Sequence, residues 1–117
     1  MKSILFVCLG NICRSPMAQT IFENLLLNQG IRESYITDSA GLHNYHEGEK
    51  ADSRMRTHAE KHGYNITHRS RPIIQSDFEK FDLIVGMDNQ NIRELQRLSK
   101  NDTHRAKIVR MTDFLQQ

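Results

Sequence analysis

The sequence predicts a single α/β domain built on a mostly parallel β-sheet. Stretches typical of strands alternate with stretches of helical periodicity, in the order strand, helix, strand, helix, strand, helix, strand. Strands joined by right-handed helical crossovers run parallel to one another. The length agrees with one domain, because 117 residues with 38% hydrophobic and 26% charged residues suffice for one small hydrophobic core.

Four strands are predicted, each from an apolar run. Residues 4–7 form a continuous apolar run of the kind that fits a parallel strand buried on both faces. Further apolar runs predict strands at 35–37, 81–86 and 106–111. Residues 39–48 are rich in Gly, His and Asn, and we expect them to form a loop that walls a pocket at the carboxyl end of the second strand.

The predicted helices carry start and stop signals. Ser15 is a good cap and Pro16 suits the first helical position. Apolar residues recur at helical spacing behind them, and Gly30 supplies the left-handed residue that ends helices. Asp52 and Asp88 are the expected caps of two further helices. The Ser-x-x-Glu pattern at 76–79 predicts a capping box that opens a short helical turn.

The segment between the first strand and the first helix, CLGNICRS at positions 8–15, is suited to binding a tetrahedral anion. The backbone N–H groups of a glycine-containing loop and of a helix N-terminus point at one spot there. These amides and the guanidinium of Arg14 stabilise a thiolate on Cys8, which makes the sulfur nucleophilic. The planar fork of Arg14 binds two phosphate oxygens at once. The pattern predicts phosphoryl transfer to sulfur, with an inert packing cysteine as the alternative.

With this motif the chain resembles the low-molecular-weight protein tyrosine phosphatases. Residues 6–18, FVCLGNICRSPMA, are similar to the active-site signature of that family. Further matches follow along nearly the whole chain, at Asp38–Gly41, Tyr45, His68, Ser70, Arg71 and Phe81–Asp88. The resemblance implies a three-layer, flavodoxin-like fold with a four-stranded parallel sheet in the order 2-1-3-4 and helices on both faces. It also implies hydrolysis of phosphotyrosine in proteins.

The resemblance assigns the catalytic roles. Cys8 would be the nucleophile that becomes a phosphocysteine, and Ser15 would donate a hydrogen bond to its sulfur. Arg14 would hold the phosphoryl group together with the amides of the loop. These amides belong to Leu9, Gly10, Asn11, Ile12, Cys13 and Arg14 itself.

The resemblance also assigns supporting roles, each with a simpler alternative. Asn11, Ser39 and His68 would form a hydrogen-bond network that shapes the loop, although Asn tolerates left-handed backbone and a histidine in a basic stretch is often solvated. Tyr45 would form a wall against the substrate ring, or be an ordinary surface aromatic residue. Cys13 would protect Cys8 as a reversible disulfide under oxidation, or be a small buried side chain.

One departure from the family pattern lies at the end of the sequence. The family places a general-acid Asp, followed by Pro, in a loop after the fourth strand, and then a last helix. Here the prolines are at 16 and 72 only, and Asp113 lacks a following proline. We therefore expect the domain at 1–117 to be C-terminally incomplete, with no general acid identified. Losing that acid slows the release of a tyrosine leaving group by roughly 10²- to 10⁴-fold.

Three rival functions differ in class. Arsenate reductases share the fold and loop but use additional cysteines later in the chain, and none follows Cys13. Protein arginine phosphatases resemble the chain but carry Thr where this chain has Ile12, which favours an aryl phosphate substrate. A phosphatase relic that binds phosphate and lacks its general acid is the non-enzyme alternative.

The composition and charge of the chain limit the kinds of binding partner that we expect. A net charge of +2 is too mild to indicate nucleic-acid or membrane-surface binding, and no apolar run approaches the ~20 residues that span a bilayer. Two cysteines in one loop make no disulfide framework, so we expect a cytoplasmic setting. The histidines show no metal-ligand spacing, and we expect neither metal nor cofactor. The expected partners are a phosphotyrosine protein and a cognate tyrosine kinase, and the expected state is a monomer or weak dimer.

Overall fold

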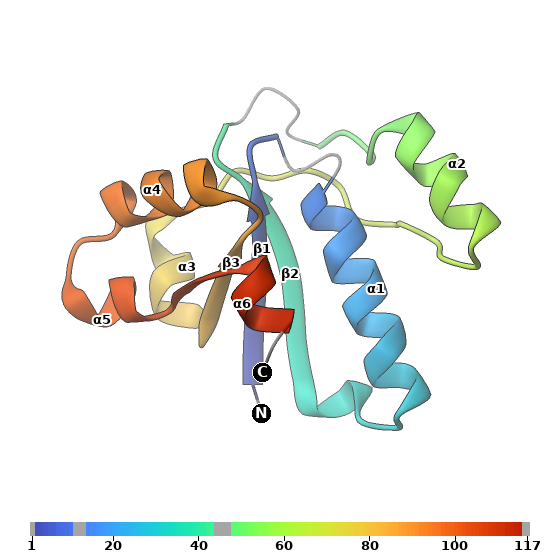
Figure 1. The fold of residues 1–117 in the computed structure, drawn as a ribbon, viewed down its shortest axis with the longest axis horizontal. Helices are drawn as coiled ribbons and strands as arrows, with labels where there is room; N and C mark the ends of the chain where they lie inside the picture. Colours follow the sequence, from blue (N-terminus) through green and yellow to red (C-terminus); the bar gives the residue numbers. More distant parts are fainter. Residues whose placement is uncertain (1, 11–13, 44–47, 116–117) are drawn as a thin grey trace.

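A four-stranded parallel sheet runs through the middle of the computed structural model, which describes residues 2–10, 14–43 and 48–115 (Figure 1). The strand order is β2-β1-β3-β4 and every pair is parallel, as predicted. The strands are β1 (Lys2–Cys8), β2 (Tyr35–Gly41), β3 (Leu83–Gly86) and β4 (Ile108–Arg110). The order makes β1 a central strand, so its apolar run can be buried on both faces.

Helices cover both faces of this sheet. On one face lie α1 and α6, and on the other lie α3 and α4 (Figure 1). The helices are α1 (Arg14–Asn28), η1 (Arg32–Ser34), α2 (Ser53–Lys61), α3 (Gln75–Lys80), α4 (Asn89–Leu98), α5 (Asp102–Ala106) and α6 (Met111–Leu115). The three-layer α/β arrangement predicted from the sequence is therefore confirmed.

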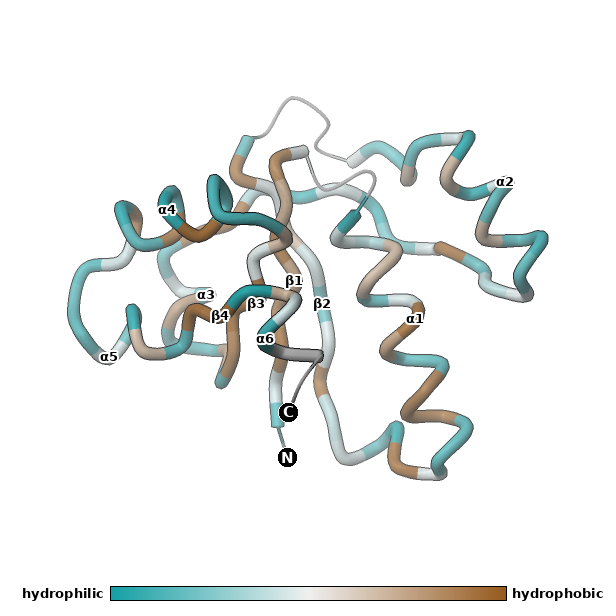
Figure 2. Tube along the Cα trace, viewed as in Figure 1, coloured by the Kyte–Doolittle hydropathy of each residue, from teal (hydrophilic) through white to brown (hydrophobic). Residues whose placement is uncertain are grey.

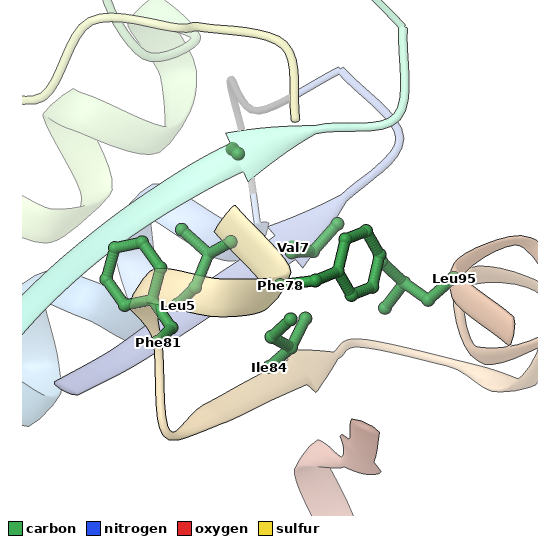
Figure 3. Close-up of a cluster of buried hydrophobic side chains, with 7 residues drawn as sticks. Leu5, Val7, Phe78, Phe81, Ile84 and Leu95 are labelled. Carbon is green, nitrogen blue, oxygen red and sulfur yellow. The ribbon is translucent and has the colours of Figure 1, made fainter. Parts of the chain in front are cut away.

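The side chains of β1 point alternately to the two faces of the sheet and so divide the core into two halves. Leu5 and Val7 pack with Ile84, Phe78 and Leu95 under α3 and α4 (Figure 3). Ile4 and Phe6 point to the opposite face and pack under α1. In Figure 2 the apolar colouring lies along parts of the sheet and of α1, whereas α2 is mostly hydrophilic. Because successive strand residues face opposite sides, one continuous apolar run serves both layers.

The structure confirms the predicted caps of two helices. The side chain of Asp52 accepts a hydrogen bond from the N–H of Met55 at the start of α2. The side chain of Asp88 does the same for the N–H of Asn91 at the start of α4. Beyond the end of α1, Gly30 has a φ of 73°, the left-handed conformation that glycine adopts at low cost.

The predicted end of the second strand was wrong. Residues 39–41 continue β2 and pair with Phe6, Val7 and Cys8 of β1. The amide of Gly41 also donates to the carbonyl of Arg71, at 2.8 Å. Small residues such as these are typical of loops, but their pairing with β1, and the additional bond of Gly41, hold them extended.

Other boundaries also differ from the predictions. The third strand begins at Leu83 rather than 81, and the fourth spans Ile108–Arg110, because Ala106 ends α5. The short helix α3 starts at Gln75, so Ser76 is inside it and not its cap. The carboxylate of Asp77 accepts the N–H of Ile74 instead, at 2.8 Å. Within the described ranges, no helix has the length and apolar character needed to cross a bilayer.

Candidate active site

The candidate nucleophile lies at the carboxyl edge of the sheet. Cys8 is the last residue of β1 and is 4% exposed. Its carbonyl accepts a hydrogen bond from the N–H of Leu42, at 3.0 Å, just after β2. On the other side, the N–H of Met87 donates to the carbonyl of Val7 after β3. The loops after three parallel strands therefore meet around Cys8, which is where ligands bind in open α/β sheets.

A serine hydroxyl contacts the sulfur of this cysteine. The Oγ of Ser15 lies 3.0 Å from the Sγ of Cys8. Ser15 is fully buried and is the second residue of α1, so the prediction that it caps this helix was wrong. The strand-to-helix turn thus brings sulfur and hydroxyl together at a helix N-terminus, where a negative charge is stabilised by the helix dipole and by unpaired amides.

Arg14 lies at the entrance to this site and is paired with an acidic residue. Its Nη1 is 2.9 Å from the Oδ2 of Asp88, and its side chain is half exposed. Asp88 uses its other carboxylate oxygen to cap α4. The capping hydrogen bond from Asn91 and the charge of Arg14 together hold the pKa of Asp88 below its ordinary value. An anion that binds over Cys8 must compete with this carboxylate for Arg14.

Replacing Asp88 by asparagine is expected to tighten the binding of inorganic phosphate about two- to fivefold. Asparagine keeps an oxygen that can cap α4, but it removes the charge that Arg14 contacts in the structure. Isothermal titration calorimetry with phosphate measures the effect, and urea unfolding provides the control for an intact cap. Weaker phosphate binding in the variant would show that Asp88 orients Arg14 and does not compete for it.

The first loop residues are tied to two other segments. The N–H of His43 donates to the carbonyl of Leu9 at 2.9 Å, and the hydroxyl of Ser70 donates to the carbonyl of Gly10 at 3.3 Å. Both carbonyls are therefore engaged by neighbouring segments, which hold Leu9 and Gly10 in place after Cys8.

His68 lies beside β2, and its side chain is 14% exposed. Its Nδ1 is 3.5 Å from the Oδ1 of Asp38, and the ring also hydrogen-bonds to the backbone of Ser39. Burial lowers the pKa of His68 below 6.5, and the charge of Asp38 only partly offsets this effect. The imidazole is therefore mostly neutral at neutral pH.

The lowered pKa of His68 makes the stability of the fold depend on pH. Because the pKa of His68 is lower in the folded protein than in the unfolded chain, the unfolded chain binds more protons. The contribution of His68 to the free energy of unfolding is complete above pH 6.5 and is lost as the pH falls below that value. We expect the urea midpoint to decrease between about pH 7.5 and about pH 5.5, and less steeply in His68→Gln. Equal slopes in the two proteins would contradict the assignment.

Two carboxylates and an arginine fasten the stretch around His68 to the sheet. The Nε of Arg71 donates to Asp38 at 3.0 Å, and its two terminal nitrogens each donate to an oxygen of Asp77 at 3.0 Å. Burial disfavours the charge of Arg71, but the hydrogen bonds that it donates to Asp77 and Asp38, together with their negative charges, outweigh burial and raise the pKa of Arg71. This bidentate pair fixes residues 68–77 next to the end of β2.

The structure brings some of the predicted site residues together and leaves others untested. Cys8 and Ser15 are in contact, but the Oγ of Ser39 is buried without a hydrogen-bond partner among the described residues. His68 reaches the backbone of Ser39 rather than its hydroxyl. The remaining predicted residues, Asn11, Ile12, Cys13 and Tyr45, lie outside the described residues.

Sequence reasoning missed two carboxylates near the site. Asp88 was predicted as a helix cap only, and its pairing with Arg14 joins residues 74 positions apart. Asp77 was given no role of its own, because the predicted capping box used Ser76 and Glu79, whereas its carboxylate holds Arg71. Asp113 pairs with Arg110 at 3.1 Å. Across the described ranges, no group of three His, Cys, Asp or Glu side chains is arranged to hold a metal ion.

The fold is shared with known phosphatases. The family model "Low molecular weight phosphotyrosine protein phosphatase" matches residues 3–117. The human protein of that name is 44% identical over 108 residues, which cover 92% of this chain and 68% of the human protein. A protein tyrosine phosphatase from Entamoeba histolytica, solved with Hepes in the active site, superposes with a TM-score of 0.94 at 46% identity, covering 97% of this chain and 72% of that one. An arginine phosphatase from drosophila superposes with a TM-score of 0.89 at 34% identity, covering 100% of this chain and 74% of that one.

Proposed function

Because this chain belongs to the low molecular weight phosphotyrosine protein phosphatase family, we propose that it hydrolyses phosphotyrosine monoesters in proteins through a phosphocysteine on Cys8. The observation that carries this proposal is the contact of 3.0 Å between the Cys8 sulfur and the Ser15 hydroxyl. A buried hydroxyl at that position serves a sulfur that alternates between thiolate and phosphothioester.

In the first step, the Cys8 thiolate attacks phosphorus in line with the leaving oxygen. The S–P bond forms as the P–O bond to the tyrosine ring breaks, and the phenolate takes its proton from solvent or from an acid. Arg14 leaves Asp88 and binds two phosphoryl oxygens, while the loop amides bind the remaining charge. The chemistry needs charge stabilisation and positioning, which amides and a guanidinium supply.

In the second step, water attacks phosphorus and the S–P bond breaks. Inorganic phosphate is released and the thiolate returns. The hydroxyl of Ser15 donates to the developing charge on sulfur, which makes Cys8 a better leaving group. The cycle consumes one water and needs no cofactor.

Rapid mixing with p-nitrophenyl phosphate tests this proposal. The nitrophenolate is a good leaving group that needs little acid, so we expect a fast release of one equivalent per protein, followed by slower turnover. Acid quenching during turnover should trap a phosphoryl group on the peptide that contains Cys8, detectable by mass spectrometry. Phosphate binding without any release or any trapped phosphocysteine would instead indicate a phosphate-binding relic.

A second candidate is a protein arginine phosphatase. The similarity to the drosophila arginine phosphatase supports it, since phosphoarginine can be accommodated on this fold. Protein arginine phosphatases are similar to one another in carrying threonine at this position. This chain has Ile12 there, which favours phosphotyrosine. Hydrolysis rates on matched phosphotyrosine and phosphoarginine peptides separate the two candidates.

We also infer the cellular location, the partners and the oligomeric state of this phosphatase. A buried free cysteine that must stay reduced favours a cytoplasmic location. The substrates are phosphotyrosine proteins, with a cognate tyrosine kinase as the natural opposing partner. The net charge of +2 gives no reason to expect nucleic acid or a membrane surface, and we propose a monomer or weak dimer.

A further inference from the structure

A small pocket opens beside the candidate nucleophile, on the face of the sheet covered by α4. Its volume is about 120 Å³. Its walls come from the loops after β1 and β2 and from the first two turns of α4. The lining residues are Leu9, Leu42, His43, Gln90, Asn91 and Glu94.

The walls of this pocket are continuous with the phosphoryl site. Leu9 follows Cys8 directly and is 48% exposed. Leu42 is held next to Cys8 by the hydrogen bond of 3.0 Å from its N–H to the cysteine carbonyl. On the helix side, the cap of α4 is Asp88, which contacts Arg14. A substrate held over Cys8 therefore places its neighbouring residues near this opening.

The pocket wall contains an unused hydrogen-bond acceptor. Asn91 is 2% exposed, and its Oδ1 has no hydrogen-bond partner among the residues that the structure describes. Leaving a buried acceptor unpaired costs free energy. A side chain that donates an N–H to Asn91 Oδ1 therefore binds in the pocket more tightly than one that presents only carbon atoms.

The rim of the pocket carries a negative charge. A hydrogen bond from Arg97 holds the pKa of Glu94 below its ordinary value, so this carboxylate is ionised at neutral pH. The partner Arg97 is 68% exposed and lies three residues along the same helix. Such exposed ion pairs contribute little to stability, so another cation can easily take the place of Arg97 beside Glu94.

We propose that this pocket binds a lysine or arginine side chain next to the phosphotyrosine of the substrate. The proposal rests on the proposed function. The aliphatic stem of the basic side chain packs on Leu9 and Leu42, and its N–H groups reach Asn91 Oδ1 and the Glu94 carboxylate. A purely apolar side chain would leave Asn91 unpaired, and an acidic one would meet the charge of Glu94.

Hydrolysis of a peptide series tests this proposal. Each phosphotyrosine peptide carries, at one of the three positions on either side of the phosphotyrosine, lysine, its uncharged analogue norleucine, or glutamate. We expect one position at which kcat/KM for lysine exceeds that for norleucine roughly three- to tenfold, with glutamate lowest. The advantage should shrink as sodium chloride is added, because salt screens the charge of Glu94. The leaving group is the same in all peptides, so differences in its protonation cancel.

Two matched variants identify the carboxylate. Glu94→Gln should lower the lysine-to-norleucine ratio and remove its dependence on salt, leaving only the part that comes from Asn91 Oδ1. Asp102→Asn removes an exposed carboxylate that pairs with Arg105 three residues along α5, as Glu94 pairs with Arg97, and should leave the ratio unchanged. Both positions are at least 39% exposed, so neither change should affect folding.

The outcomes separate this proposal from the function on which it rests. Equal kcat/KM for lysine and norleucine peptides at every position would overturn the pocket assignment while leaving phosphotyrosine hydrolysis intact. An undiminished lysine preference in Glu94→Gln would also overturn it. No Cys8-dependent hydrolysis of any peptide or of p-nitrophenyl phosphate would overturn the proposed function itself.

Discussion

Replacing Cys8 by serine is expected to lower kcat for p-nitrophenyl phosphate by on the order of 10⁴-fold or more. The hydroxyl of serine is far less acidic than a thiol, so no anion forms in the loop to attack phosphorus. The helix N-terminus, the amides and Arg14 remain in place. Binding of inorganic phosphate should therefore persist, or tighten, because a negative sulfur no longer repels the anion.

Stopped-flow absorbance measures the loss of turnover, and calorimetry measures the retained phosphate binding. Circular dichroism and the urea midpoint show whether the fold is intact, which matters because Cys8 is buried at the end of a central strand. If a correctly folded Cys8→Ser protein loses less than tenfold in kcat, the phosphocysteine mechanism is wrong. A loss of both turnover and phosphate binding would instead show that the substitution disrupts the loop.

Replacing Arg14 by lysine is expected to lower kcat/KM by roughly 10²- to 10³-fold, although the charge is kept. The flat guanidinium can give two parallel hydrogen bonds to the phosphoryl oxygens as they gather charge, and an ammonium cannot. Part of the loss should appear in kcat, because the second hydrogen bond matters most in the transition state.

The matched control is Arg54→Lys, because Arg54 is 94% exposed on α2. This control should keep wild-type kcat and KM. A loss below tenfold in Arg14→Lys would mean that another group holds the phosphoryl oxygens. Guanidine added to Arg14→Ala should restore part of the activity if the missing group is the planar fork itself.

Much of the candidate site follows from residues that are close in sequence. Cys8, Arg14 and Ser15 lie within eight positions, and a strand before them and a helix after them leave one compact turn that joins them. The contact between Cys8 and Ser15 is of this local kind. Local sequence is therefore a good guide here, since the chain has little freedom between the two elements.

The second strand shows where local sequence misleads. Ser39, Ala40 and Gly41 have the composition of a loop, yet they are strand residues because all three pair with β1 and Gly41 also bonds to the stretch at 71–73 on its other side. Strand structure depends on such partners more than helix structure does. The short strand β4 was likewise predicted too long, because α5 uses the residues before it.

By itself, the sequence determined the order of the four strands and of the helices α1 to α4 between them, the buried strand β1 and the cysteine-containing turn, because each is set by the periodicity or spacing of neighbouring residues; it missed α5 and α6. Only the tertiary structure decided that Asp88 holds Arg14, that Asp38 and Asp77 hold Arg71, and that a pocket with an unpaired acceptor adjoins Cys8. These contacts join residues between 6 and 74 positions apart. Charge pairing and burial act through space, so they become definite only when the parallel sheet has brought the ends of its strands together.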